Sequence, residues 1–535
     1  MGKKHRRKSY DYEFEEEFDD NAVDLNEYDR NDYKGSAEDD GKENEKEPLE
    51  PLSPEEKRKM AAERLRSLDA LRGLNMLCII GLATLITAIC HLHSQDFQVF
   101  GDAAVRAAHA FRQSWIGPEP ATIAKHMEHT EWNGVLHHDT IFPLFLFLAG
   151  VSWPFSLFKQ QANERPTWRI LLKILWRGIA LVILGIIYSN KVRFDFENLR
   201  YMGVLQHIGL AWMFAALIYW PLARHTKTLV GICALILVSY WFVVALVPAP
   251  DVAPKEAFSA SAYSARFKEM FQPRPCPIFE DNALPDFDAE DYPEIGTVAH
   301  NFLPEGCVVN YVDRKLVPGK LYHEPKKVGD EDFRRANVQE YDPALFRQLR
   351  DPEGLASTWP AIATALLGMI FGGFIRRDDR EWSRWKKLSA LLIGGVILLV
   401  IGWGWHYLFP INKNLWNSSF VCFVGGYSAL ALATFYFLFD ILPLRWLAFP
   451  FAVVGMNSIT IFVAKRVVDF SNMRDFFFKD AIDRFVPTTY DMIVNGETVT
   501  VECTSFAKIA TYIAGLIVSW CFLYWLYRRK IFMRV

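Results

Sequence analysis

Ten runs of about twenty apolar residues recur between residues 74 and 527, and they restrict the fold more strongly than any other feature. A helix of that length crosses a hydrocarbon core of about 30 Å. Inside such a core every backbone polar group needs an internal partner, which helices provide. The expected spans are residues 74–92, 139–158, 168–188, 202–222, 228–247, 354–375, 388–408, 416–439, 446–464 and 506–527. We therefore predict an all-α, polytopic membrane helix bundle with about ten transmembrane helices.

Lysine and arginine gather on alternate connections between these spans. They precede the first run, fill every second connection and follow the last run. Short cytoplasmic connections carry an excess of positive charge in membrane proteins. We therefore expect a multi-pass protein of an inner or plasma membrane with both termini in the cytoplasm. Residues 248–352 then form a long extracytoplasmic connection, which we expect to cap the bundle.

The first 63 residues differ sharply from the rest of the chain. Residues 11–50 hold eighteen acidic side chains and four basic ones. Such a composition cannot bury enough apolar surface to fold. We predict a disordered, charged cytoplasmic tail over residues 1–63 and a transmembrane domain over residues 64–535. Within that domain, Cys276 and Cys307 share the outer connection, and the sequence leaves open whether they form a disulfide.

The densest polar cluster lies just before the second span, between Lys125 and Asp139. It contains four histidines, His126, His129, His137 and His138. No HExxH or CxxC spacing accompanies them, so we expect no metal. A histidine that acts as a general base is the favoured functional interpretation, because imidazole titrates near neutral pH. Composition alone does not choose among the four.

Further polar side chains occur at positions where contact with lipid would be costly. Ionisable groups at membrane depth usually face an interior cavity, whereas Ser, Thr and Asn also serve as contacts between helices. Both interpretations remain open for Asn457 and Ser458. The candidate binding residues are Asp69, Arg72, Gln206, Glu353, Ser357, Asn412, Lys413, Asn414, Asn457 and Ser458.

Six short motifs in a fixed order resemble the heparan-α-glucosaminide N-acetyltransferase family, and its bacterial members more closely. Each motif is weak alone, but their order from residue 66 to about residue 464 is specific. They are Arg66-Ser-Leu-Asp-Ala-Leu-Arg-Gly73, His129-Thr-Glu-Trp-Asn-Gly134 with Asp139-Thr-Ile-Phe-Pro143, Gly203-Val-Leu-Gln206, Glu353-Gly354 with Leu366-Leu-Gly368, Pro410-Ile-Asn-Lys-Asn-Leu-Trp416, and Gly455-Met-Asn-Ser458.

The resemblance implies transfer of an acetyl group from cytosolic acetyl-CoA to an amine of glucosamine across the membrane. The family's active-site histidine, three residues before Trp-Asn-Gly, corresponds to His129. Asp139 would then orient this histidine or Asn133 would polarise the carbonyl, with Trp132 among the binding residues. The chain departs from the family at His207, where an arginine is common.

From these features we expect an acyl-CoA-dependent enzyme that modifies an extracytoplasmic sugar or glycan amine or hydroxyl. Acetyl-CoA would be the co-substrate, the lipid bilayer the surroundings, and no nucleic acid a partner. Direct transfer and a transient acyl-histidine remain open, as does a homo-oligomer. The alternatives are a secondary transporter and a non-catalytic component of a glycan export or modification complex.

Overall fold

The computed structural model describes residues 65–190, 199–274, 276–280, 284–323, 343–442, 444–494 and 497–533. The predicted tail lies outside these residues. Nine described helices are long and apolar enough to cross a membrane, and a bent pair makes a tenth if it forms one span. The prediction of an all-α membrane protein with about ten spans is therefore confirmed.

The spans coincide closely with the predicted apolar runs. The first consists of α2 (Arg66–Leu77), a π-helical turn η3 (Cys78–Leu82) and α3 (Ala83–Cys90). The bent pair is α17 (Arg445–Met456) and α18 (Ser458–Val467). The others are α6 (His137–Ala162), α7 (Thr167–Ser189), α8 (Val204–Leu222), α9 (Thr226–Leu246), α14 (Thr358–Ile375), α15 (Arg384–His406), α16 (Ser418–Tyr436) extended by η7 (Phe437–Ile441), and α20 (Ser505–Arg528).

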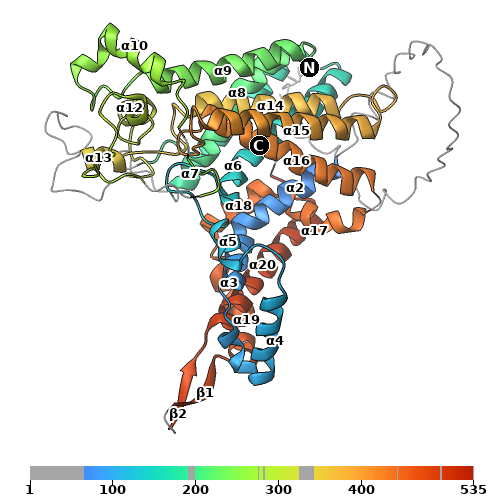
Figure 1. The fold of residues 1–535 in the computed structure, drawn as a ribbon. Coiled ribbons are helices and arrows are strands. Elements are labelled where there is room, and N and C mark those ends of the chain that lie inside the picture. Colours follow the sequence, from blue (N-terminus) through green and yellow to red (C-terminus); the bar gives the residue numbers. More distant parts are fainter. Residues whose placement is uncertain are drawn as a thin grey trace, which may run out of the picture.

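Helices α6 and α14 pack backbone against backbone at the centre of the bundle (Figure 1). A Cβ added at Gly150 would lie 2.3 Å from the carbonyl oxygen of Ala365, and one at Gly368 would lie 2.1 Å from that of Phe147. Small residues permit this approach, which favours helix association where no hydrophobic effect operates. The close packing fixes α6, whose first turn carries the candidate site.

Two spans are broken. In the first span Gly81 has a φ of 149°, within the π-helical turn. The ammonium group of Lys465, on α18, donates to the carbonyl oxygen of Ile80 at 2.6 Å. The second break separates α17 from α18 by 53° at Asn457. A carbonyl released by the π-helical turn is thus bonded by a side chain of the other broken span, as lipid-embedded backbone requires.

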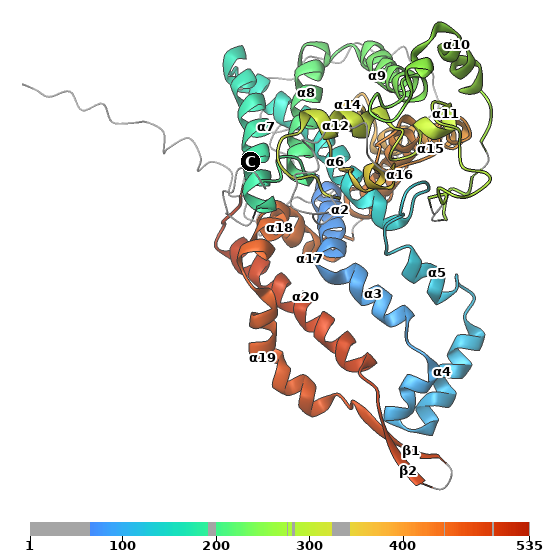
Figure 2. The same ribbon diagram turned by 90° about the vertical axis from the view of Figure 1, so that its left-hand side faces the viewer.

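An arm projects away from the bundle (Figures 1 and 2). It is built from α3, α20, η4 (Ser94–Phe100), α4 (Asp102–Ser114), α19 (Phe470–Phe485) and an antiparallel hairpin of β1 (Thr489–Val494) and β2 (Glu497–Glu502). The hydroxyl of Ser505 donates to Asp96 at 3.2 Å, and Phe97 and Phe100 contact Phe506 edge-on. These contacts join η4 to the start of α20.

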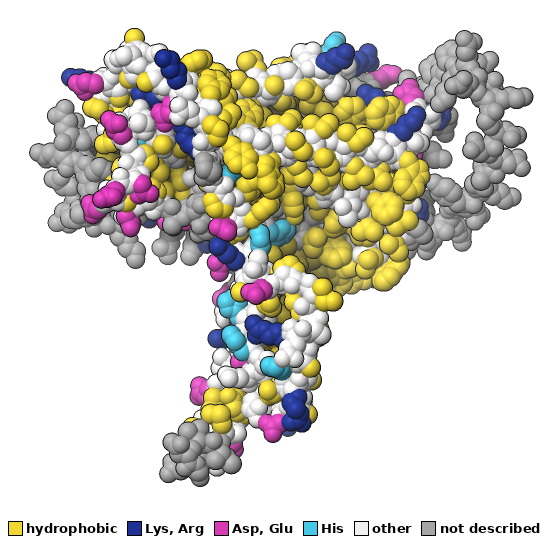
Figure 3. All heavy atoms as spheres, viewed as in Figure 1, with side chains coloured by type: hydrophobic (Ala, Val, Ile, Leu, Met, Phe, Trp, Pro, Cys, Tyr) yellow, Lys and Arg dark blue, Asp and Glu magenta, His cyan; other side chains and the backbone are white. Residues whose placement is uncertain are grey.

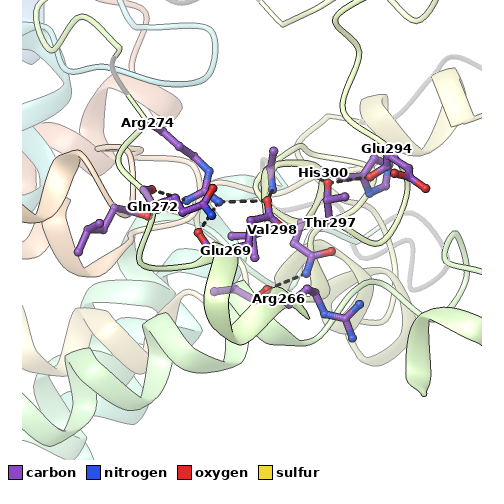
Figure 4. A network of polar contacts seen from close by, with 12 residues as sticks. Arg266, Glu269, Gln272, Arg274, Glu294, Thr297, Val298 and His300 are labelled. Atoms are coloured by element: carbon purple, nitrogen blue, oxygen red, sulfur yellow. Dashed lines mark hydrogen bonds and ion pairs between the residues drawn. The ribbon is translucent and has the colours of Figure 1, made fainter. Parts of the chain in front are cut away.

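The connection between α9 and α14 forms short helices on one end of the bundle. These are η5 (Lys255–Phe258), α10 (Ala260–Glu269), α11 (Val298–Asn301), α12 (Val308–Leu316) and α13 (Pro343–Gln348). Figure 4 shows how Glu269 accepts hydrogen bonds from the backbone of Val298 at 3.0 Å and from Arg274 at 3.1 Å. Cys276 and Cys307 are unpaired in the structure.

Candidate functional site

His129 and Asp139 form a hydrogen-bonded pair at the start of α6. Nδ1 of His129 lies 2.6 Å from Oδ1 of Asp139, whose side chain is fully buried. Oδ2 of Asp139 accepts hydrogen bonds from the backbone N–H of Leu136 at 3.1 Å and of Thr130 at 3.2 Å. A carboxylate with these donors at a helix N-terminus is stabilised in its charged form.

This arrangement determines the chemistry that His129 can offer. Because the Asp139 carboxylate only accepts hydrogen bonds, Nδ1 of His129 carries the proton of their bond. Nε2 then has the lone pair, and the His129 side chain is 53% exposed. A carboxylate that holds the tautomer of a histidine with an accessible Nε2 is an arrangement suited to general-base catalysis.

Lys413 completes the cluster from the turn between α15 and α16. Its Nζ lies 3.3 Å from Oδ1 of Asp139 and 3.0 Å from Nδ1 of His129. An ammonium group cannot donate to a protonated Nδ1, so the ion pair with Asp139 is the attractive contact. Lys413 therefore adds positive charge beside the pair and opposes protonation of Asp139.

The two asparagines that flank Lys413 hold the Trp-Asn-Gly loop. Nδ2 of Asn412 donates to Oδ1 of Asn133 at 3.1 Å, and Nδ2 of Asn414 donates to the carbonyl oxygen of Glu131 at 3.1 Å. The backbone N–H of Gly134 donates to Ile411 at 2.8 Å. Two motifs almost 280 residues apart thus form one surface.

Trp132 links this loop to the outer connection. Its side chain is 1% exposed, its Nε1–H donates to the carbonyl oxygen of Phe302 at 2.9 Å, and Arg350 lies over its ring. At Gly134 the φ is 101°, and an added Cβ would lie 2.2 Å from the carbonyl oxygen of Glu280. The loop therefore needs glycine at this position for both conformation and space.

Gln206 and His207 lie buried on the first turn of α8. The side chain of Gln206 has no hydrogen-bond partner among the described residues, and the His207 ring lies beside the backbone of Glu353 and Gly354. The His207 ring packs 4.8 Å from Trp416 and 5.6 Å from Phe142. His207 is thus connected to the His129 cluster by packing, since Trp416 follows the Lys413 turn and Phe142 follows Asp139 by one turn.

Glu353 belongs to a separate ion-pair cluster. Arg200 donates to Asp351 and to Glu353, each at 2.9 Å. The hydroxyls of Ser357 and Thr358 donate to the carbonyl oxygen of Gly354 at 3.0 and 3.1 Å. Sequence reasoning missed Arg200 and Asp351, which flank spans and carry no distinctive pattern.

Asp69 and Arg72 lie on α2, away from the His129 cluster. Arg72 forms an ion pair with Asp69 at 3.7 Å and donates to the carbonyl oxygen of Leu148 at 3.1 Å and to the hydroxyl of Ser152. Ser152 follows Asp139 by thirteen residues on α6, a separation of about 20 Å along the helix.

Arg177 of α7 is a charged residue that the sequence reasoning missed. It stacks on Trp212 at 4.2 Å, lies close enough to Arg72 to repel it, and has no ion pair among the described residues. A lone arginine within an apolar run was the signal that could have found it.

Asn457 and Ser458 occupy the break between α17 and α18. Asn457 is buried, and its Oδ1 accepts a hydrogen bond from the hydroxyl of Thr460 at 3.4 Å. The predicted binding residues therefore fall into several groups. Those that join the His129 cluster or its loop are Trp132, Asn412, Lys413 and Asn414.

The family model described as "Heparan-alpha-glucosaminide N-acetyltransferase, catalytic" matches residues 120–271, which contain His129, Asp139 and Gln206. The heparan-alpha-glucosaminide N-acetyltransferase of Mus musculus is 24% identical over 441 residues, covering 78% of this chain and 56% of that protein. The Homo sapiens protein of the same name is 25% identical over 361 residues, covering 64% of this chain and 49% of that protein.

The chain spans about half the length of these curated relatives. The similarity extends well beyond the residues matched by the family model, because the mouse protein aligns with most of the chain. Together with the order of the motifs, these matches relate the chain to the heparan-alpha-glucosaminide N-acetyltransferase family.

Proposed function

We propose that this membrane protein is an acyltransferase that moves an acetyl group from acetyl-CoA to an amine or hydroxyl of an extracytoplasmic sugar or glycan. The observation that carries the proposal is the 2.6 Å contact between Nδ1 of His129 and Oδ1 of Asp139, with the side chain of His129 53% exposed. The matched catalytic family supports the same reaction class. The activity requires no ATP, because attack of an amine on a thioester is downhill.

His129 acts as the general base. Its Nε2 takes the proton of the acceptor nitrogen as that nitrogen forms a bond to the carbonyl carbon of the thioester. The imidazolium is stabilised by Asp139 and returns the proton to the departing sulfur as the C–S bond breaks. The products are the amide and a thiol, and His129 regains its starting state.

Asn133 and Lys413 stabilise the negative charge that develops on the carbonyl oxygen. Oδ1 of Asn133 accepts from Asn412, so its own Nδ2–H group is the donor that Asn133 can direct at the oxyanion. Lys413 supplies a positive charge held by Asp139. Such fixed donors are typically worth 10²–10³ in rate.

Arg72 and Arg177 bind the anionic part of the donor. Two cations at membrane depth, one of them without an ion pair among the described residues, favour an anionic ligand. Their group lies about 20 Å along α6 from Asp139, a distance on the order of an extended pantetheine arm. The donor would thus enter from the predicted cytoplasmic side and reach His129 through the bundle.

The orientation of the chain is part of the proposal. The excess of Lys and Arg on alternate connections supports an orientation with both termini in the cytoplasm of an inner or plasma membrane. The start of α6, with His129 and Asp139, then faces the exterior, where the acceptor is. Residues 248–352 form the extracytoplasmic cap of the 64–535 domain.

One observation favours a second candidate, a secondary transporter. Two broken spans meet where Lys465 donates to Ile80, and broken helices form solute sites in many transporters. Purified protein in liposomes, given labelled acetyl-CoA and glucosamine, separates the two. Acetylated glucosamine supports the enzyme, whereas solute accumulation with intact acetyl-CoA supports the transporter and overturns the proposed activity.

A further inference from the structure

A large cavity of about 660 Å³ opens beside the His129 cluster, and the proposed reaction leaves it without a role. Its walls come from Val400, Trp403 and Gly404 of α15, Phe423 and Tyr427 of α16, and Phe279 of the outer connection. We call this the α15–α16 groove. Its volume falls within the range of ordinary ligand pockets, about 300–1,000 Å³.

The α15–α16 groove opens on the lateral surface of the helix bundle. Val400 is 66% and Trp403 47% exposed on α15, whereas Phe423 at the floor is 7% exposed. Both α15 and α16 are candidate spans, and the face they form is predominantly hydrophobic (Figure 3). A molecule that enters this groove therefore comes from the hydrocarbon of the bilayer rather than from water.

The groove is lined almost wholly by apolar surface, and four of its lining residues adjoin the candidate active site. These are His126, His137, Thr140 and Tyr427, and the hydroxyl of Tyr427 is 3.1 Å from Nδ1 of His137. The backbone N–H of His138 donates to His126 at 3.0 Å, and the His138 ring packs edge-on against His129 at 4.5 Å. The apolar groove thus adjoins the loop that carries the general base.

An apolar chain with a polar head next to the reacting histidine fits this arrangement. We propose that the acceptor is a lipid-linked aminosugar, whose hydrocarbon chain lies in the α15–α16 groove and whose sugar reaches His129. This inference rests on the proposed acyltransferase function. The donor's acyl chain is the other candidate occupant, but acetyl-CoA is water-borne, whereas the groove opens toward lipid and at the predicted outer ends of α6 and α15.

Gly404 offers a way to fill the groove without disturbing the bundle. A Cβ added there would meet no atom within 4 Å, and the same holds for Gly231 on α9. Both glycines are exposed and lie inside spans, so Gly404→Phe and Gly231→Phe change the helices equally. Only Gly404→Phe occupies the groove.

The test compares methyl glucosaminide with hexadecyl glucosaminide, using protein in nanodiscs and labelled acetyl-CoA. For Gly404→Phe, the KM for the hexadecyl acceptor should rise about tenfold. That change corresponds to roughly two methylene groups of the acceptor that are no longer buried. Its kcat/KM for the methyl acceptor should stay unchanged, and Gly231→Phe should match the parent protein with both acceptors. Equal effects of the two variants on the hexadecyl acceptor would overturn the inference.

A binding readout keeps this test separate from the acyl-transfer reaction. Hexadecyl glucosaminide with a diazirine in its chain should label peptides containing Trp403 or Phe423, and label them less in Gly404→Phe. Equal labelling by a diazirine alkane without sugar would assign the groove to bulk lipid and refute the inference. A defect of Gly404→Phe confined to longer acyl-CoA donors would refute it as well. Groove labelling in a protein that transfers no acetyl group would refute only the proposed reaction.

Discussion

The connection between the first two spans has two halves with very different surroundings. Its first half, η4 and α4, belongs to the arm and contains no buried residue. Its second half, residues 125–139, is held from three directions, by the Lys413 turn, by Phe302 and by Ile278. The difference indicates that a loop needs several distant anchors before it can hold a reactive side chain in one geometry.

The largest expected effect comes from removing the histidine of the second half. His129→Ala should lower acetyl transfer by about 10²–10⁴-fold, because a positioned general base contributes that much. The control is His109→Ala, an exposed histidine in the first half, which should leave the rate unchanged. Rates with labelled acetyl-CoA, at equal protein amounts, provide the measurement. Similar rates for the two variants would remove the distinction between the halves.

A glycine in each half tests the anchoring itself. Gly134 and Gly101 both have a positive φ, 101° and 92°, but only Gly134 is crowded. Alanine at either position costs about 1 kcal/mol of conformational strain. Gly134→Ala must also displace the carbonyl oxygen of Glu280, so it should reduce transfer about tenfold or more, whereas Gly101→Ala should retain it. Thermal unfolding and initial rates should both separate the pair, and equal losses would count against the anchoring argument.

A smaller and pH-dependent effect is expected from the outer connection that anchors the second half. Asp313 on α12 is fully buried, and burial raises its pKa to about 7 from an ordinary value of 3.8. The folded protein therefore keeps a proton that the unfolded chain loses, so stability falls as the pH rises from about 4 to about 7. Asparagine does not titrate, so the stability of Asp313→Asn should not fall in this way as the pH rises.

The melting temperature of Asp313→Asn should exceed that of the parent protein at pH 8, and the difference should disappear below pH 4. Asp251, which pairs with Arg314 at 2.8 Å, gives the opposite control, since Asp251→Asn breaks an ion pair and should destabilise at pH 8. A higher melting temperature of Asp313→Asn at acidic pH alone would contradict the predicted pH dependence.

The spans were predictable because contact with lipid requires apolar side chains along the whole length of a membrane-crossing helix. Most of their ends differ by a few residues from the prediction, but the first span begins at Arg66, eight residues before the predicted start at residue 74. The breaks at Gly81 and Asn457 were not predictable, because the contact that accompanies them, between Lys465 and Ile80, joins two distant parts of the chain. Such contacts depend on residues almost 400 positions apart.

The candidate site was predictable only in part. The run of histidines indicated the loop in which the candidate site lies, and resemblance selected His129. No local pattern revealed that Asn412 would bind Asn133, because a long-range contact leaves no periodic signal. Charged residues within spans are candidates for function. Arg177 is such a residue, although the sequence analysis did not name it.

The proposed reaction transfers an acetyl group from a donor on one side of the membrane to an acceptor on the other, through His129. Sealed inside-out vesicles loaded with glucosamine and given labelled acetyl-CoA outside test it most directly. We expect labelled N-acetylglucosamine inside the vesicles with the parent protein, and about 10²–10⁴-fold less with His129→Ala. Product that forms only when donor and acceptor share one side, or that forms equally with His129→Ala, would contradict it.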